Sequence, residues 1–419
     1  MGLQLCQLCE IAYFVTDKIP LENVLLTDYV TTDSLLPNKE GRCVAQNLPP
    51  QKCALTHYKC GDVLVANIRP YLKKIWFADR EGGASADVLV FRAKSGHSQE
   101  FLYASLLQDT FYDYVMKGKR GSKMPRGDRD QIMRYSIPKL SLAEEACIGN
   151  MILSFCTKIN VSRRINDNLE AMAKQLYDYW FVQFDFPNEE GKPYKSSGGA
   201  MVWNEKLKRE IPVGWSVKNL GQIATSYQQG LIRSNNQLST DSKYGYLKMG
   251  DLDGKGQYTL QGLTRTNATN EEVDLYSLHK GDFLINVRNS KEIVGKTCLI
   301  GYVERNTLYN HMLVRLDFKD VSTFYMNLLF NSEFMYKALD GLKQGTTTVI
   351  ALYQSDLYRL PILIPAPCVM ERFLKITDSI LDQKEIISHE IAELTKQRNE
   401  LLPLLMNGQA TVNYHLSTY

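Results

Sequence analysis

The stretch KGDFLINVR (residues 280–288) decides the fold, because CGDVLVANIR (residues 60–69) nearly repeats it. Each has a glycine–aspartate turn followed by a short apolar run that ends in Asn and Arg. Glycine-bounded apolar runs of this length are typical of buried strands. The two copies lie roughly half a chain apart in a protein of 419 residues, a length that favours more than one domain.

Five further pairs of segments match in the same order along the chain. They are LCEIA (8–12) with LGQIA (220–224), ADVLVF (86–91) with HMLVRL (311–316), EFLYASLL (100–107) with TFYMNLLF (323–330), KRGSKMP (119–125) with KQGTTTV (343–349), and YSIPKL (135–140) with ILIPAP (362–367). The offset grows from 212 residues (8 to 220) to 227 residues (135 to 362), as loop insertions in diverged copies would make it grow. The sequence therefore predicts a duplicated protein.

A heptad pattern of apolar residues follows each copy. The first seam is Ile148, Ile152, Phe155, Ile159, Leu169, Ala173, Leu176 and Trp180, and the second is Ile376, Ile380, Ile387, Leu394, Leu401 and Leu404. Such spacing is typical of coiled coils, and a helix of about 38 residues is about 57 Å long. The alternative is that each helix packs only on its own domain.

The expected fold class is mixed α/β (α+β). Two domains related by a pseudo-two-fold axis are separated by a long antiparallel two-helix coiled coil. Residues 141–181 are expected to pair with residues 370–406.

The composition is that of a folded globular protein, with 44% hydrophobic residues and a net charge of only +3. Any nucleic-acid surface must therefore be local. No apolar run has the ~18 residues that a membrane span needs, and the N-terminus lacks a basic signal-peptide region, so we expect a cytoplasmic protein. The nine cysteines form neither a disulfide framework nor a complete zinc motif.

The chain lacks a complete catalytic motif. VGKT (294–297) resembles the end of a phosphate-binding loop, but Ser290 replaces the glycine that this loop requires. NLPP (47–50) resembles a methyltransferase loop without its aromatic residue. Asp178 with Glu190-x-Lys192 resembles a nuclease set, but helix capping and linker solvation explain these residues better. These gaps favour a binding protein over an enzyme.

A basic loop is the clearest binding signal. Residues 116–134 hold seven Lys or Arg against two Asp, a density that suits phosphate contacts. The counterpart loop in the second copy replaces charge with three threonines, which suit base-edge or backbone contacts. The candidate DNA-binding residues are Asn67, Arg69, Lys117, Lys119, Arg120, Ser122, Lys123, Arg126, Asn286, Arg288, Lys343, Gln344, Thr346, Thr347 and Thr348. The Asn and Arg residues that end the repeated strands are equally compatible with a structural role in turns.

Three segments carry a resemblance to a known family. INDNLEAMAKQLYDYWFVQFDFP (165–187), WNEKLKREIPVGWSVKNLGQIA (203–224) and LTKQRNELLPLLMNG (394–408) resemble the specificity subunit of type I restriction–modification systems. The resemblance covers almost the whole chain and implies two target recognition domains, 1–140 and 205–365. Conserved helical regions would be 141–187 and 366–408, with a linker at 188–204 and a tail at 409–419.

The resemblance also implies a function in host defence without catalysis in this chain. Each recognition domain would bind one half of a split double-stranded DNA target. Partner modification subunits, two in number, would use S-adenosylmethionine to methylate adenine, and partner restriction subunits would use ATP and Mg. No cofactor is expected in this chain. The alternative function is that of a coiled-coil adaptor that never touches DNA.

A cluster of aromatic residues suggests where the partners bind. Four aromatics in five positions exceed what one two-helix seam can hold. The candidate partner-binding residues are Tyr177, Tyr179, Trp180, Phe181, Leu401 and Leu402. The alternative is that these side chains pack against the neighbouring recognition domain.

Overall fold

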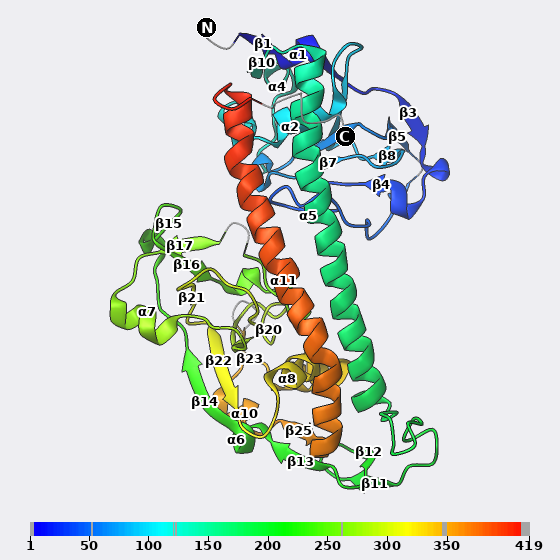
Figure 1. Cartoon of the computed structure of the whole chain (residues 1–419), viewed down its shortest axis with the longest axis vertical. Helices are drawn as coiled ribbons and strands as arrows, with labels where there is room; N and C mark the ends of the chain where they lie inside the picture. The colour runs from blue at the N-terminus through cyan, green and yellow to red at the C-terminus, as the bar shows by residue number, and fades with distance from the viewer. Residues whose placement is uncertain are drawn as a thin grey trace. The chain divides into compact units, whose positions relative to one another are not determined.

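The computed structural model describes residues 4–51, 53–119, 121, 124–260, 263–345 and 350–411 (Figure 1). The chain divides into two compact units. Residues 1–164 with 390–419 form unit 1, and residues 165–389 form unit 2. Two long helices run through both units, so the borders of the units fall inside helices. The predicted limits of the recognition domains stay a prediction.

Unit 1 contains two four-stranded sheets. The proximal sheet has the strand order β2-β9-β6-β7 and the distal sheet β3-β5-β8-β4. The proximal strands are β2 (Ala12–Phe14), β6 (Val63–Ala66), β7 (Ile75–Phe77) and β9 (Val88–Ala93). The distal strands are β3 (Lys18–Pro20), β4 (Tyr29–Val30), β5 (Ala54–Tyr58) and β8 (Gly82–Ala84). A separate pair, β1 (Leu5–Gln7) and β10 (Ser136–Pro138), is antiparallel.

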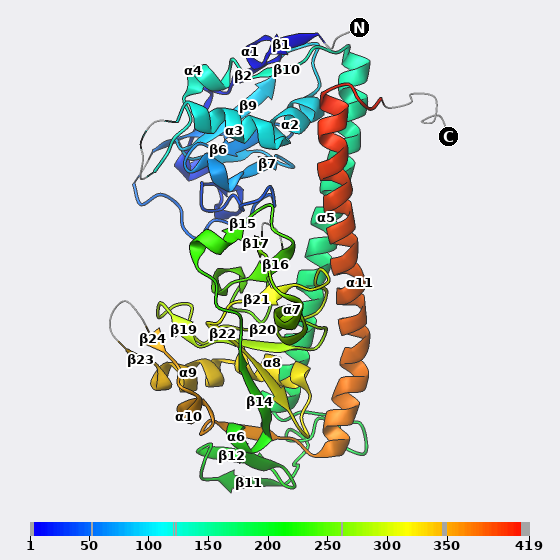
Figure 2. The same ribbon diagram turned by 90° about the vertical axis from the view of Figure 1, so that its left-hand side faces the viewer.

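Short helices complete unit 1 and cover the proximal sheet (Figure 2). They are α1 (Leu8–Ile11), α2 (Gln99–Leu107), α3 (Asp109–Lys117) and α4 (Arg129–Ile132). Seven of the nine residues of α2 are buried, so this helix is apolar on all sides, as expected of a helix enclosed by a core. The proximal sheet and its helices thus form the main core of unit 1.

Unit 2 repeats the two-sheet architecture of unit 1. Its proximal sheet has the order β14-β22-β18-β20 and its distal sheet β15-β17-β16-β21. The proximal strands are β14 (Ala224–Gln229), β18 (Phe283–Asn286), β20 (Thr297–Leu299) and β22 (Leu313–Phe318). The distal strands are β15 (Leu238–Ser239), β16 (Tyr244–Leu247), β17 (Thr264–Thr266) and β21 (Leu308–Tyr309). β13 (Ser216–Asn219) pairs with β25 (Pro361–Ile364) as β1 pairs with β10.

Short helices and small ribbons complete unit 2. The helices are α6 (Leu220–Ile223), α7 (Asn270–Tyr276), α8 (Thr323–Phe330), α9 (Glu333–Leu342) and α10 (Gln354–Leu357). The ribbon strands are β11 (Met201–Asn204), β12 (Arg209–Pro212), β19 (Arg288–Asn289), β23 (Gln344–Gly345) and β24 (Ile350–Ala351). The strand β11 lies in the predicted linker 188–204, so the end of that segment is an ordered hairpin.

One ion pair, present in both copies, explains the repeated glycine–aspartate turn. In unit 1 the Asp62 carboxylate accepts two hydrogen bonds of 2.7 Å from the Arg92 guanidinium and one of 2.7 Å from the Lys59 backbone N–H. In unit 2 Asp282 binds Arg315 at 3.1 Å and the His279 backbone N–H at 2.9 Å. The aspartate thus closes the turn and joins two strands of the proximal sheet in each copy.

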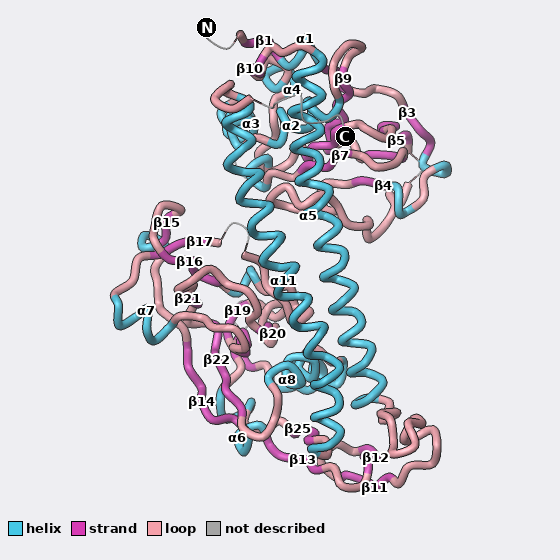
Figure 3. Tube along the Cα trace, in the orientation of Figure 1, coloured by secondary structure: helices cyan, strands magenta, loops and turns pink. Residues whose placement is uncertain are grey.

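The two long helices are α5 (Leu142–Tyr177), followed by a π-helical turn, η4 (Asp178–Val182), and α11 (Pro367–Met406) (Figure 3). In unit 1 Ser162 lies beside Glu390, and Cys156 beside Arg398. In unit 2 Asn166 lies beside Ser388, and Glu170 pairs with Lys384. Residue numbers rise on one helix as they fall on the other, so the predicted antiparallel pairing is confirmed within each unit. The pseudo-two-fold axis stays a prediction.

The seam that was predicted on α5 is correct at most positions, but that on α11 is wrong at two. Ile376 and Leu404 are 47% and 40% exposed. The buried face instead follows Val369, Phe373, Thr377 and Ile380. Thr377 at this seam donates its hydroxyl to the Phe373 carbonyl at 3.0 Å, which satisfies a buried polar group. A search for apolar residues alone passes over such a position.

Candidate nucleic-acid interface

A short antiparallel ribbon supports the basic loop of unit 1. The chain leaves β6 at Asn67, and Ile68 pairs with Arg126 across the ribbon. The Arg69 N–H donates to the Pro125 carbonyl at 2.8 Å, and the Gly127 N–H donates to the Asn67 carbonyl at 3.2 Å. The end of the repeated strand and the base of the basic loop are therefore held together, although about 60 residues separate them in the sequence.

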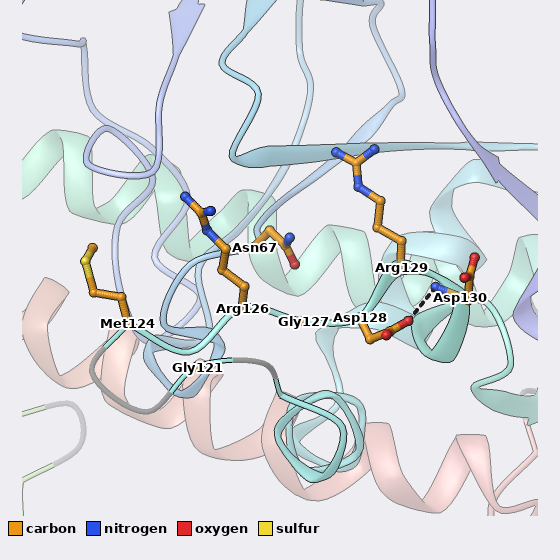
Figure 4. Close-up of a pocket in the computed structure, with 8 residues that line it drawn as sticks. All are labelled: Asn67, Gly121, Met124, Arg126, Gly127, Asp128, Arg129 and Asp130. Atoms are coloured by element: carbon orange, nitrogen blue, oxygen red, sulfur yellow. Dashed lines mark hydrogen bonds between the residues drawn. The ribbon is translucent and has the colours of Figure 1, made fainter.

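A cavity of about 730 Å³ lies at this ribbon (Figure 4). Its lining residues are Asn67, Gly121, Met124, Arg126, Gly127, Asp128, Arg129 and Asp130. Figure 4 shows the guanidinium groups of Arg126 and Arg129 on the same side of the loop backbone, with the Asn67 amide between them. A Cβ at Gly127 would lie 2.9 Å from the Asn67 side-chain oxygen, so glycine is needed for this close approach.

Two residues in this region have features that cost folding free energy, one in its side chain and one in its backbone. The Asn67 Oδ1 atom is buried and has no hydrogen-bond partner among the residues that the structure describes. An unpaired buried acceptor costs about 1–3 kcal/mol. Arg69 has a left-handed backbone, with φ of 51°, which is uncommon outside glycine. Such costs concentrate where a ligand binds.

The cationic residues of the loop are accessible. Lys117 ends α3, and Lys119, Arg69 and Arg126 are exposed. Arg126 forms an ion pair of 3.1 Å with Asp87, and both side chains are partly exposed. The predicted residues Arg120, Ser122 and Lys123 lie outside the described residues. The structure thus brings Asn67, Arg69 and Arg126 to one ribbon.

The equivalent ribbon of unit 2 has the same plan but a different arrangement of residues. Arg288 pairs with Ala351, and the Leu352 N–H donates to the Val287 carbonyl at 2.8 Å. Arg288 therefore occupies the position of Ile68, and Ala351 that of Arg126. Each ribbon has one arginine opposite one aliphatic residue, but the arginine comes from opposite strands in the two copies.

Asn286 is not the counterpart of Asn67. Its backbone N–H donates to the Lys296 carbonyl as that of Ala66 donates to the Lys74 carbonyl, so Asn286 matches Ala66. The Asn286 side chain is fully buried. Its Nδ2 donates to the Ile293 carbonyl at 3.2 Å, and its Oδ1 accepts from the Arg288 N–H at 3.1 Å. The sequence allowed either a DNA contact or a structural role in the turn for this residue. The hydrogen bonds of Asn286 fit the structural role, so Asn286 is not among the DNA contacts proposed below.

Two further candidates of unit 2 are Lys343, which directly follows α9, and Gln344, which begins β23. The Lys343 ammonium binds Asp340 at 3.2 Å and the Lys291 carbonyl at 3.0 Å. The Gln344 Nε2 donates to Asp356 at 2.8 Å. Thr346, Thr347 and Thr348 lie outside the described residues. Unit 2 therefore offers Arg288 as its most accessible cation at the ribbon, without an ion pair in the described part of the chain.

Comparison with known proteins identifies the family. Residues 212–396 match the family model of the type I restriction modification DNA specificity domain. A type I restriction enzyme specificity subunit from Methanocaldococcus jannaschii is 24% identical over 330 residues, which cover 76% of this chain and 71% of the relative. Another from Haemophilus influenzae is 22% identical, over 91% of this chain and 94% of the relative. Residues 212–396 thus match a type I DNA specificity domain, and the chain is similar to type I specificity subunits over most of its length.

A solved structure supports the fold. The crystal structure of the type I restriction–modification S subunit from M. genitalium aligns over 97% of this chain and 96% of that chain, with a TM-score of 0.52 and 12% identity. At this identity the likeness concerns the fold alone.

Most of the predicted partner-binding residues are in the interior. Tyr177, Trp180 and Phe181 are at most 3% exposed, and the Phe181 ring lies 4.8 Å from that of Phe373 and 5.8 Å from that of Trp215. Leu402 is buried in unit 1, and Leu401 packs beside it. The alternative that the sequence left open, packing within the chain, fits these residues. Tyr179 alone among the four aromatics is exposed, at 37%.

The structure shows an exposed apolar stripe of which the sequence analysis named only Tyr179. Ile165, Met172 and Tyr179 are 44%, 55% and 37% exposed, and they recur at intervals of seven residues on α5 and its π-helical turn. Val182, three positions beyond Tyr179, is 42% exposed. The signal was present in the sequence as a second heptad pattern, offset from the buried one.

Two further properties concern only the described part of the chain. No helix there is long and apolar enough to cross a bilayer. No group of three or more His, Cys, Asp or Glu side chains gathers there as a metal site would require.

Proposed function

We propose that this specificity subunit reads a bipartite double-stranded DNA target, with one recognition domain for each half. The observation that carries the proposal is the repeated ribbon, which has an arginine opposite an aliphatic residue in both copies. A two-stranded ribbon fits the major groove, where base edges differ. Because the arginine comes from opposite strands, the two ribbons would contact different base patterns.

The proposed contacts come from the polar and charged residues of each ribbon and its loop. In unit 1 they are Asn67, Arg69, Lys117, Lys119 and Arg126, with Arg120, Ser122 and Lys123 proposed from the sequence. In unit 2 they are Arg288, Lys343 and Gln344, with Thr346, Thr347 and Thr348 proposed from the sequence. Lysines at the loop would neutralise phosphates, and the ribbon residues would contact bases.

Like the type I specificity subunits, the chain assembles with methyltransferase and restriction subunits. It is not itself catalytic. We infer that it binds two modification subunits and that the stripe Ile165–Met172–Tyr179 receives a helix of one of them. Apolar residues at intervals of seven suit a partner helix. S-adenosylmethionine, ATP and Mg would be bound by the partners. We place the complex in the cytoplasm, with the DNA that it modifies.

The test uses the chain co-purified with its modification subunits. The target is mapped by methylome sequencing of a host with and without the gene. Binding is then measured on duplexes with the whole target, with either half scrambled, and with both halves scrambled. The proposal expects each scrambled half to weaken binding. A complex that assembles but binds all four duplexes equally would favour the adaptor alternative.

A further inference from the structure

We propose that Arg126 reads a guanine in the first half-site and that Asp87 is the positioning residue that holds its guanidinium for this contact. The inference rests on the proposed function and makes it more specific, because it names the base that Arg126 contacts and the residue that positions Arg126.

The position of Asp87 supports this role. Its carboxylate oxygen lies 3.1 Å from Nη2 of Arg126, and its backbone carbonyl accepts the Asn67 N–H at 2.9 Å. Asp87 directly precedes β9, a strand that pairs with β6 over residues 88–91 and with β2 over residues 91–93. The carboxylate is therefore anchored to the same ribbon as Arg126 and to the proximal sheet.

Charge argues against a simple phosphate contact for Arg126. A carboxylate that close to the guanidinium would repel a phosphate, and an exposed pair of this kind stabilises a fold by only about 0–1 kcal/mol. The pair therefore has little value for stability. A guanidinium has five N–H donors, and one contact with Asp87 leaves enough of them for the two acceptors, O6 and N7, that guanine offers in the major groove.

The second copy has a different residue at the position of Asp87. The residue equivalent to Asp87 is Met312, because the Val287 N–H donates to its carbonyl at 2.9 Å. Arg288 thus lacks this carboxylate neighbour, and His311 lies near it instead. An arginine positioned by this carboxylate is specific to the first copy, so the inference concerns only the first half-site.

The experiment measures binding of the complex with modification subunits by fluorescence anisotropy. The probes are the mapped target, a scrambled duplex, and targets in which each guanine of the first half-site is replaced singly by 7-deazaguanine, which lacks N7. One replacement should weaken binding of the unaltered complex roughly tenfold, within the range of a good base contact. In Asp87→Asn this sensitivity should fall below about twofold, while binding to the scrambled duplex stays equal or rises because a negative charge is lost.

Asp130→Asn is the matched control, because it removes one negative charge from the cavity wall and leaves the Arg126–Asp87 pair intact. It should raise binding to all duplexes alike and keep the 7-deazaguanine sensitivity. The inference is overturned if no guanine of the first half-site is sensitive, or if Asp87→Asn behaves like the control. A complex that does not prefer its target to the scrambled duplex would instead overturn the proposed function itself.

Discussion

Replacing Arg92 with methionine should lower the free energy of unfolding of unit 1 and leave that of unit 2 unchanged. The Asp62 side chain is 1% exposed, and Arg92 is its bidentate partner. These hydrogen bonds raise the pKa of the Arg92 guanidinium. In Arg92→Met the carboxylate remains buried without its counter-charge. Breaking a buried pair costs about 3–5 kcal/mol, and the 17% exposure of Arg92 places this pair near 3 kcal/mol.

The assay is hydrogen exchange read by mass spectrometry on the full chain, because two compact units need not unfold in one transition. A loss of about 3 kcal/mol corresponds to roughly 100-fold faster exchange of the amides in β6 and β9. The amides of β18 and β22 should not change. Arg80→Met is the control: its pair with Asp79 is about half exposed and should contribute less than about 1 kcal/mol. Equal acceleration in both units, or an effect no larger than that of the control, would refute the reasoning.

Three further predictions concern the seam, the partner surface and the basic loop. Ile380→Asp should lower the thermal midpoint sharply because it buries a charge, whereas Ile376→Asp, on the exposed face, should change it little; similar midpoints would contradict the observed seam. Met172→Asp should reduce co-purification of modification subunits without lowering the thermal midpoint, and unchanged co-purification would place the partner elsewhere. Replacing Lys117 and Lys119 with alanine should flatten the log–log salt dependence of DNA binding by about 0.9 per lost phosphate contact, with sequence preference retained; an unchanged slope would remove both from the interface.

The duplication and the helix pair were predictable from the sequence because both depend on periodic patterns. The glycine–aspartate turns recur with their strands, and the proximal sheets have the same strand order. The heptad spacing predicts two paired helices, although it misplaces Ile376 and Leu404, which are exposed while their neighbours Thr377 and Leu405 are buried.

The site was less predictable because it depends on alignment to the single residue. The sequence pairs Asn67 with Asn286, but the hydrogen bonds pair Ala66 with Asn286. A shift of one residue on a strand moves a side chain to the other face, so one asparagine lies at a cavity and the other in the core. The order of the distal strands also differs between the copies, and pairing between strands distant in sequence leaves no local pattern.

The burial of most of the predicted partner-binding aromatics was unpredictable for a related reason. The number of aromatic residues around 177–181 indicates that they cannot all pack into one two-helix seam. It does not indicate which part of the protein covers the remaining rings. Phe373, Trp215 and Tyr325 lie against these rings, and they come from three distant segments. Only the structure brings them together.

The central claim is that the two copies divide the target between them, and exchange of one loop tests it most directly. Residues 117–126 are replaced by the corresponding loop of another specificity subunit, and the methylome of a host carrying the variant with its modification subunits is sequenced. The account predicts a new methylation motif that differs from the original in one half only. A motif altered in both halves, or unaltered while methylation persists, would contradict it.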